Sequence, residues 1–139
     1  MTEKTLVLLK PDCMQKNVAG IVIARLQEKG LRIVACKMLA LTEAILRDHY
    51  DFLADKPFFP NILSYMQECP VLALVLEGED AIATTRNLMG PTDSSIAPKG
   101  TIRGDFGVDK SRNVIHASDS EASAKKEIER FFTKEEVFA

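Results

Sequence analysis

Two nearly continuous apolar runs constrain the fold of this chain more than any other feature. Residues 5–9 read Thr-Leu-Val-Leu-Leu, and residues 71–76 read Val-Leu-Ala-Leu-Val-Leu. Runs of this kind are typical of buried central strands. The first run stops at Pro11, and the second is followed by a predicted turn at residues 77–80. Because such strands must be covered, the rest of the chain has to supply elements that pack on a sheet.

Weaker patterns predict two more strands and several helices. Residues 31–41 alternate in part, and Val114-Ile115 is a short apolar pair, so both are expected as strands. Residues 18–29 have apolar side chains at helical spacing and end at Gly30. Further helices are expected over residues 61–67, 81–89 and 119–132, with Asp80 capping the second.

Thr42 is suited to cap a helix that runs to His49. We expect His49 on the surface of that helix, without a functional role. The order of elements fits an α+β, ferredoxin-like split β-α-β fold, a four-stranded antiparallel sheet with helices packed on one face. The same pattern also fits a small parallel α/β sheet. No repeat or linker interrupts the sequence, so one domain over residues 1–139 is expected.

Composition excludes several kinds of partner. Hydrophobic residues make up 46% of the chain, charged residues 27%, and the net charge is −2, so there is no overall basic field for nucleic acid or a membrane surface. The N-terminal residues lead directly into a strand pattern, so no signal peptide is expected. Cys13, Cys36 and Cys69 are widely spaced and are expected to be reduced thiols of a cytoplasmic protein.

The stretch Asn113-Val-Ile-His-Ala-Ser-Asp-Ser120 carries the strongest functional signal. It places His116 where a strand is expected to end, and Ser118, with Glu121 three residues later, resembles a capping box that starts the next helix. A polar side chain at such a junction can face a cleft, and helix N–H groups there can help to hold an anion. His116 could therefore be a half-buried structural residue, or a nucleophile or general base.

Candidate phosphate-binding cations are Lys10, Arg86 and Arg103. Lys10 lies at the end of the first strand, where ligand clefts often form, and an arginine can grip phosphate oxygens with two donors. Residues 92–112 form a long loop that we expect to be ordered and functional, with apolar anchors. The sequence has no Walker A motif and no protein-kinase glycine loop, so side chains must hold any phosphates.

These motifs resemble those of nucleoside diphosphate kinases over nearly the whole chain. The octet resembles the active-site signature of that family, Lys10-Pro11-Asp12 resembles its first signature, and Pro57-Phe58-Phe59 resembles its base-binding segment. The resemblance implies the ferredoxin-like antiparallel fold. It also implies transfer of a γ-phosphoryl group from a nucleoside triphosphate to a nucleoside diphosphate, by a ping-pong mechanism with little base selectivity.

The resemblance also implies roles for individual residues. His116 would be the nucleophile, phosphorylated on Nδ1, with Glu127 and Ser118 orienting its ring. Lys10 and Asn113 would contact the ribose hydroxyls. The remaining matched positions would bind the base and the phosphates: Tyr50, Phe58, Arg86, Thr92 and Arg103. Mg²⁺ would arrive on the nucleotide phosphates, since the chain shows no carboxylate cage to serve as a metal site.

The family likeness implies further properties of the whole protein. Substrates would be ribo- and deoxyribonucleoside tri- and diphosphates, with no membrane partner and no specific nucleic acid. The chain would form a homo-oligomer built from dimers, a hexamer in preference to a tetramer. Positions that depart from the usual pattern are Asp93-Ser94, Pro98, Lys110 and Ala117.

Two other functions use the same features. A ferredoxin-like nucleotide sensor or nucleic-acid binder could keep the fold without the chemistry, since fold alone does not determine function. Such a binder would not need His116 together with Glu127 and both arginines. A phosphate donor to histidines of partner proteins would use the same nucleophile as the kinase.

Overall fold

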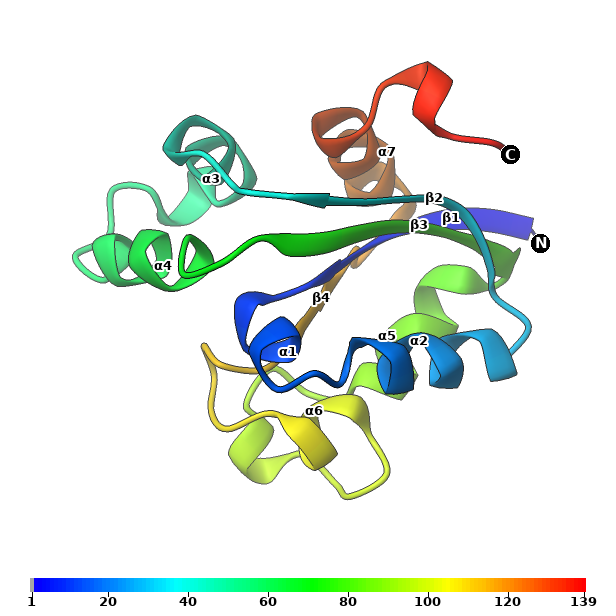
Figure 1. Ribbon diagram of the computed structural model, residues 1–139, viewed down its shortest axis with the longest axis horizontal. Coiled ribbons are helices and arrows are strands. Elements are labelled where there is room, and N and C mark those ends of the chain that lie inside the picture. The colour runs from blue at the N-terminus through cyan, green and yellow to red at the C-terminus, as the bar shows by residue number, and fades with distance from the viewer. Residues whose placement is uncertain (1) are drawn as a thin grey trace.

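The computed structural model describes residues 2–139 and contains one four-stranded sheet with helices around it (Figure 1). The strands are β1 (Thr2–Leu9), β2 (Arg32–Leu39), β3 (Val71–Glu79) and β4 (Ile115–Ala117). The α-helices are α1 (Pro11–Gln15), α2 (Ala19–Glu28), α3 (Glu43–His49), α4 (Phe59–Met66), α5 (Ala81–Met89), α6 (Ile102–Phe106) and α7 (Glu121–Phe131). Short 3₁₀ turns are η1 (Asp51–Leu53), η2 (Ser94–Ile96) and η3 (Lys134–Glu136).

The sheet has the strand order β2-β3-β1-β4, and every pair is antiparallel. The two apolar runs form the central neighbours β1 and β3, as predicted. The α+β, ferredoxin-like arrangement is therefore confirmed, and the parallel alternative is excluded.

Helices cover both faces of the sheet, so the expectation of a single covered face was wrong. Val7 and Leu9 of β1 pack with α2 and α5 on one face. Leu6 and Leu8 pack with residues of α3, α4 and α7 on the other. In Figure 1, α2 and α5 lie on the opposite side of the strands from α3 and α7. The unbroken apolar run is the physical reason, because a strand that is covered on both faces has no polar side.

The predicted turn at residues 77–80 is instead the end of β3, which continues through Glu79. Glu77, near the end of β3, forms ion pairs with Lys4 of β1 and Arg32 of β2, the strands on either side of it. Cross-strand pairs of opposite charge favour continued pairing. Asp80 stands at the N-cap position of α5, but its side chain makes no cap hydrogen bond there.

The start of the last helix also differs from the prediction. Ser120, not Ser118, is the N-cap of α7, and its side chain accepts a hydrogen bond from Ser123 N at 3.1 Å. The Ser118 hydroxyl donates to Glu127 at 2.6 Å instead of capping the helix. His116 lies within β4, one residue before the strand ends at Ala117.

The loop over residues 92–112 contains the short helix α6, capped by Thr101 and anchored by the fully buried Ile102. This agrees with the expectation of an ordered loop with apolar anchors. No helix within residues 2–139 is long and apolar enough to cross a membrane.

Candidate active site

A cavity of about 1020 Å³ lies between the ends of β1 and β4 and the segment that includes α3 and α4. Nine of the ten site residues expected from the sequence line it: Lys10, Tyr50, Phe58, Arg86, Thr92, Arg103, Asn113, His116 and Glu127. The tenth, Ser118, is fully buried behind Glu127. The fold thus gathers residues that are up to 117 positions apart in the sequence, from Lys10 to Glu127.

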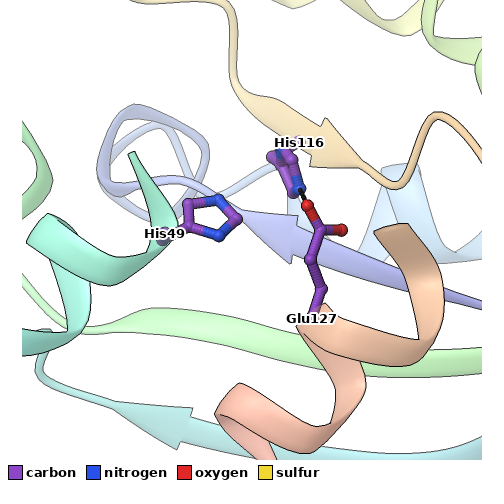
Figure 2. A group of neighbouring side chains, drawn as sticks. All are labelled: His49, His116 and Glu127. Carbon is purple, nitrogen blue, oxygen red and sulfur yellow. Dashed lines mark hydrogen bonds and ion pairs between the residues drawn. The ribbon is translucent and has the colours of Figure 1, made fainter. Parts of the chain in front are cut away.

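The His116 imidazole is held at one nitrogen by a carboxylate (Figure 2). Its Nε2 lies 3.2 Å from Oε2 of Glu127, which projects from α7. The Ser118 hydroxyl donates to the other oxygen of Glu127 at 2.6 Å and accepts a hydrogen bond from Leu6 N. Because a carboxylate oxygen accepts, the proton of the ring lies on Nε2 and the lone pair lies on Nδ1.

Glu127 stays ionised in this position. Burial alone would raise its pKa, but the hydrogen bonds that it accepts from His116 and Ser118 lower it below the ordinary value. An ionised carboxylate is a stronger acceptor than a neutral acid, so it holds the Nε2–H firmly.

A buried aspartate fixes the approach to β4. Val114 adopts a left-handed backbone conformation with φ of 64°, which is strained for a β-branched residue. Its N–H donates to Asp12 Oδ2 at 3.1 Å, and its carbonyl accepts from Lys10 N at 2.9 Å. The Tyr65 hydroxyl donates to the other oxygen of Asp12. Asp12 and Tyr65 therefore hold the segment that leads to His116, and sequence reasoning gave neither residue a role.

Lys10 and Asn113 meet at one end of the cavity. Lys10 Nζ donates to Asn113 Oδ1 at 2.7 Å and to the carbonyl of Ser111 at 2.9 Å. The Asn113 amide donates to the carbonyls of Thr92 and Lys110, which fixes its orientation. Burial lowers the pKa of Lys10 to about 8, while Asp12 opposes the shift and Arg103 adds to it.

Two arginines lie close together in the cavity wall. Arg103 is only 5% exposed and donates to the carbonyls of Ile115 and Gly90 at 2.8 and 3.2 Å. Arg86 donates to the Ala117 carbonyl at 3.1 Å. Burial and the nearby charge of Arg86 lower the pKa of Arg103 to about 10. Two cations held together this way attract an anion, and phosphate suits their donor geometry.

Aromatic side chains form the outer part of the cavity. Phe58 is 48% exposed and presents a ring to the opening, where a planar group could stack on it. Tyr50 lies deeper, and burial together with the charge of Glu127 raises its pKa to about 12, so its phenol stays protonated.

His49 was expected on the helix surface, and this expectation was wrong. It is 6% exposed, and its ring centroid lies 4.6 Å from that of His116 at an angle of 80° (Figure 2). It ends α3 with its ring turned towards Phe131 of α7, a contact between distant segments that local periodicity does not predict. Its position directly before Tyr50 was the signal that could have drawn attention to it.

The donors in the cavity suit a metal that arrives with its ligand. Among the described residues that line the cavity, the carboxylates are Asp119, which is exposed, and Glu127, which is engaged by His116 and Ser118. Mg²⁺ prefers oxygen ligands and is often bound through one or two carboxylates plus substrate phosphates. This donor set fits Mg²⁺ carried on phosphates rather than a protein cage.

A second grouping, His49, His116 and Glu127, has potential ligand atoms within 4.8 Å of one another. It is poorly prepared for a metal. Arg130 Nη1 lies 3.0 Å from Nδ1 of His49 and can only donate a hydrogen bond. The proton of His49 must therefore lie on Nε2, so neither ring nitrogen has a free lone pair for a metal.

The chain is similar to known proteins in both sequence and structure. The family model described as nucleoside diphosphate kinase matches residues 3–137. A nucleoside diphosphate kinase of Methanobrevibacter smithii is 47% identical over 137 residues, 99% of this chain and 91% of that protein. One of Archaeoglobus fulgidus is 48% identical over 135 residues, 97% of this chain and 89% of that protein.

A solved structure is also similar to this chain in fold. The nucleoside diphosphate kinase of Halobacterium salinarum, in complex with CDP, superposes with a TM-score of 0.96 at 41% identity, covering 100% of this chain and 93% of that chain. Likeness at this level extends over both sequence and fold.

Proposed function

The chain belongs to the nucleoside diphosphate kinase family and transfers phosphate between nucleotides; on this premise we propose that it works in two half-reactions through a phosphate carried on His116. The observation that carries this proposal is the contact of His116 Nε2 with the Glu127 carboxylate, which leaves the Nδ1 lone pair free in a cavity lined by Lys10, Arg86 and Arg103. A pure binding site would gain nothing from an imidazole oriented in this way.

In the first half-reaction, Nδ1 of His116 attacks the γ-phosphorus of a nucleoside triphosphate. A bond forms between Nδ1 and phosphorus, and the bond from phosphorus to the β–γ bridging oxygen breaks, so the nucleoside diphosphate leaves. The Nε2 proton stays hydrogen-bonded to Glu127, which offsets the positive charge that the ring gains. In the second half-reaction, a β-phosphate oxygen of another nucleoside diphosphate attacks the phosphorus and releases His116.

The other cavity residues bind and orient the nucleotide in this proposal. Arg86, Arg103 and the Thr92 hydroxyl contact phosphate oxygens, whose charge shifts during transfer. Lys10 and Asn113, already joined at 2.7 Å, contact the ribose hydroxyls. Mg²⁺ would be carried on the nucleotide phosphates and would offset their negative charge there.

Substrate breadth follows from how the base is held. The exposed ring of Phe58 supports stacking, which accepts any base because every base has a π-face. Tyr50 lines the same cavity. We therefore infer that purine and pyrimidine nucleotides, with ribose or deoxyribose, all serve as substrates. The Halobacterium salinarum structure, with CDP, supports a pyrimidine nucleotide as a ligand.

We also propose one domain over residues 1–139 and a homo-oligomer built from dimers, a hexamer in preference to a tetramer. β2 is an edge strand of the sheet, and Met38 on it is 61% exposed, which supports pairing with a second copy. A cytoplasmic location is proposed because Cys13, Cys36 and Cys69 are free thiols. Burial raises the pKa of Cys13 to about 12, so it is not a reactive nucleophile.

Replacement of the nucleophile tests the proposed mechanism. His116→Ala should lose phosphate exchange between ATP and CDP by at least about 10⁴-fold, because no other group replaces the covalent step. Binding of ADP, measured by calorimetry, should stay within a few-fold, since the cationic groups and Phe58 remain. Substantial exchange by His116→Ala would refute transfer through this residue.

A further inference from the structure

The buried His49 and the partly buried Arg130 form a hydrogen-bonded pair next to His116. Arg130 lies three residues after Glu127 on α7, and its side chain is 15% exposed. Its Nη1 donates to His49 Nδ1 at 3.0 Å, and its Nε donates to Asp48 Oδ2 at 2.8 Å. Residues three apart share a helix face, so one face of α7 holds both imidazoles, His116 through Glu127 and His49 through Arg130.

The contact with Arg130 fixes the chemical form of His49. A guanidinium has only donors, so Nδ1 of His49 must accept and the proton must lie on Nε2. Burial is the main cause that lowers the pKa of His49 to about 3. His49 is therefore a neutral ring of one fixed tautomer and adds no charge next to the nucleophile.

The packing around His49 holds it against His116. Its ring lies edge-on to Tyr50 at 4.7 Å and to Phe131 at 5.3 Å between centroids, and to His116 at 4.6 Å. The bond to Glu127 fixes one atom of the His116 ring, and a planar ring held at one atom can still tilt about that contact. A perpendicular ring at 4.6 Å blocks this tilt because the two would collide.

We propose that His49, fixed by Arg130, is a positioning residue that sets the plane of the His116 ring and so directs Nδ1 at the phosphorus atom. The proposal rests on phosphorylation of His116, the function proposed above. Its energetic basis is alignment: a misplacement of about 1 Å can cost roughly a hundredfold in rate. His49 touches His116 and acts through it, and it exchanges no proton with the substrate.

Four variants separate this role from general stability. His49→Ala removes the packing ring, His49→Phe keeps a ring of similar size, and Arg130→Gln weakens the support of His49. Arg47→Gln is the matched control, because it removes the same charge from an exposed i,i+4 ion pair with Glu43 on α3. Single-turnover phosphorylation by ATP should fall roughly tenfold to a hundredfold in His49→Ala. It should fall a few-fold in Arg130→Gln and by less than about threefold in His49→Phe and Arg47→Gln. ADP affinity should stay within about twofold in all four.

The site of phosphorylation gives a readout that loss of stability would not move. In the wild-type protein, NMR of the phosphohistidine should show phosphate on Nδ1 alone. In His49→Ala, a fraction should appear on Nε2, because the ring can turn. A wild-type rate in His49→Ala with phosphate only on Nδ1 would overturn the proposal. If His49→Ala does not fold, a rate for Arg130→Gln equal to that of Arg47→Gln overturns it instead. Absence of phosphohistidine in the wild-type protein would refute the proposed function and not this step.

Discussion

At the scale of single residues, Lys10 carries a charge that the proposed function requires, and it is buried. Its pKa is lowered to about 8, chiefly by burial. The Lys10 side chain is therefore protonated well below that pH and loses its charge as the pH rises through it. Because kcat/KM reports groups of the free enzyme, it should fall above about pH 8. Lys10→Arg should lose this alkaline limb, since a guanidinium stays charged, although its overall rate should be lower. A wild-type kcat/KM that stays constant to pH 10 would show that the charge of Lys10 is not needed.

Individual site residues could be predicted to the extent that they belong to sequence motifs. His116, Lys10 and Asn113 lie in short signatures, and the structure gathers them with the matched arginines in one cavity. His49 and Tyr65 could not be found this way. Their significance lies in contacts with His116 and Asp12, residues 67 and 53 positions away, and no local pattern reports such contacts.

At the scale of elements, two serines near the start of α7 have different tasks. Ser120 caps the helix, so Ser120→Ala should lower the free energy of unfolding by about 1 kcal/mol with little effect on the rate of transfer. Ser118 donates to Glu127, so Ser118→Ala should lose roughly tenfold in rate, the equivalent of one buried hydrogen bond. Urea denaturation and steady-state kinetics of both variants check this. A loss of stability in Ser118→Ala and a loss of rate in Ser120→Ala would show that Ser118 is the cap.

Strands and helices were predictable in kind, while their ends were less so. The two apolar runs predicted β1 and β3, because a short apolar stretch without polar alternation is typical of a buried strand. The end of β3 was missed because the ion pairs of Glu77 with Lys4 and Arg32 arise between strands that are distant in sequence. The start of α7 was missed for a similar reason, since the hydrogen bond from Ser118 to Glu127 is a tertiary contact.

At the scale of the whole molecule, the β2 edge of the sheet supports assembly, although Phe138 N donates to the Val34 carbonyl at one point along it. β2 pairs only with β3 within the described chain, and Met38 on β2 is largely exposed. Light scattering should give a multiple of the 15.4 kDa chain mass, with six copies favoured. Met38→Glu should shift the distribution towards smaller species, because a charge on an edge strand opposes pairing. Ala122→Glu, an exposed position on α7 with the same charge change, should not. A wild-type monomer at micromolar concentration would contradict the assembly.

The antiparallel topology was predictable from the order of elements together with the family likeness. The covering of both faces was already implied by the apolar run of β1, but the expectation of one covered face did not use it. How the chain folds back to form the cavity depends on the left-handed turn at Val114, held by Asp12, which no pattern in the sequence displays.

The central claim is that phosphate passes through His116, and incubation with ATP and Mg²⁺ in the absence of any acceptor tests it most directly. With γ-labelled ATP, we expect release of ADP and one acid-labile phosphate per chain, located on His116 by fragmentation mass spectrometry. Added CDP should then remove the label and yield labelled CTP, and His116→Ala should take up none. Full exchange between ATP and CDP without any labelled protein would show direct transfer between two bound nucleotides and would contradict the account.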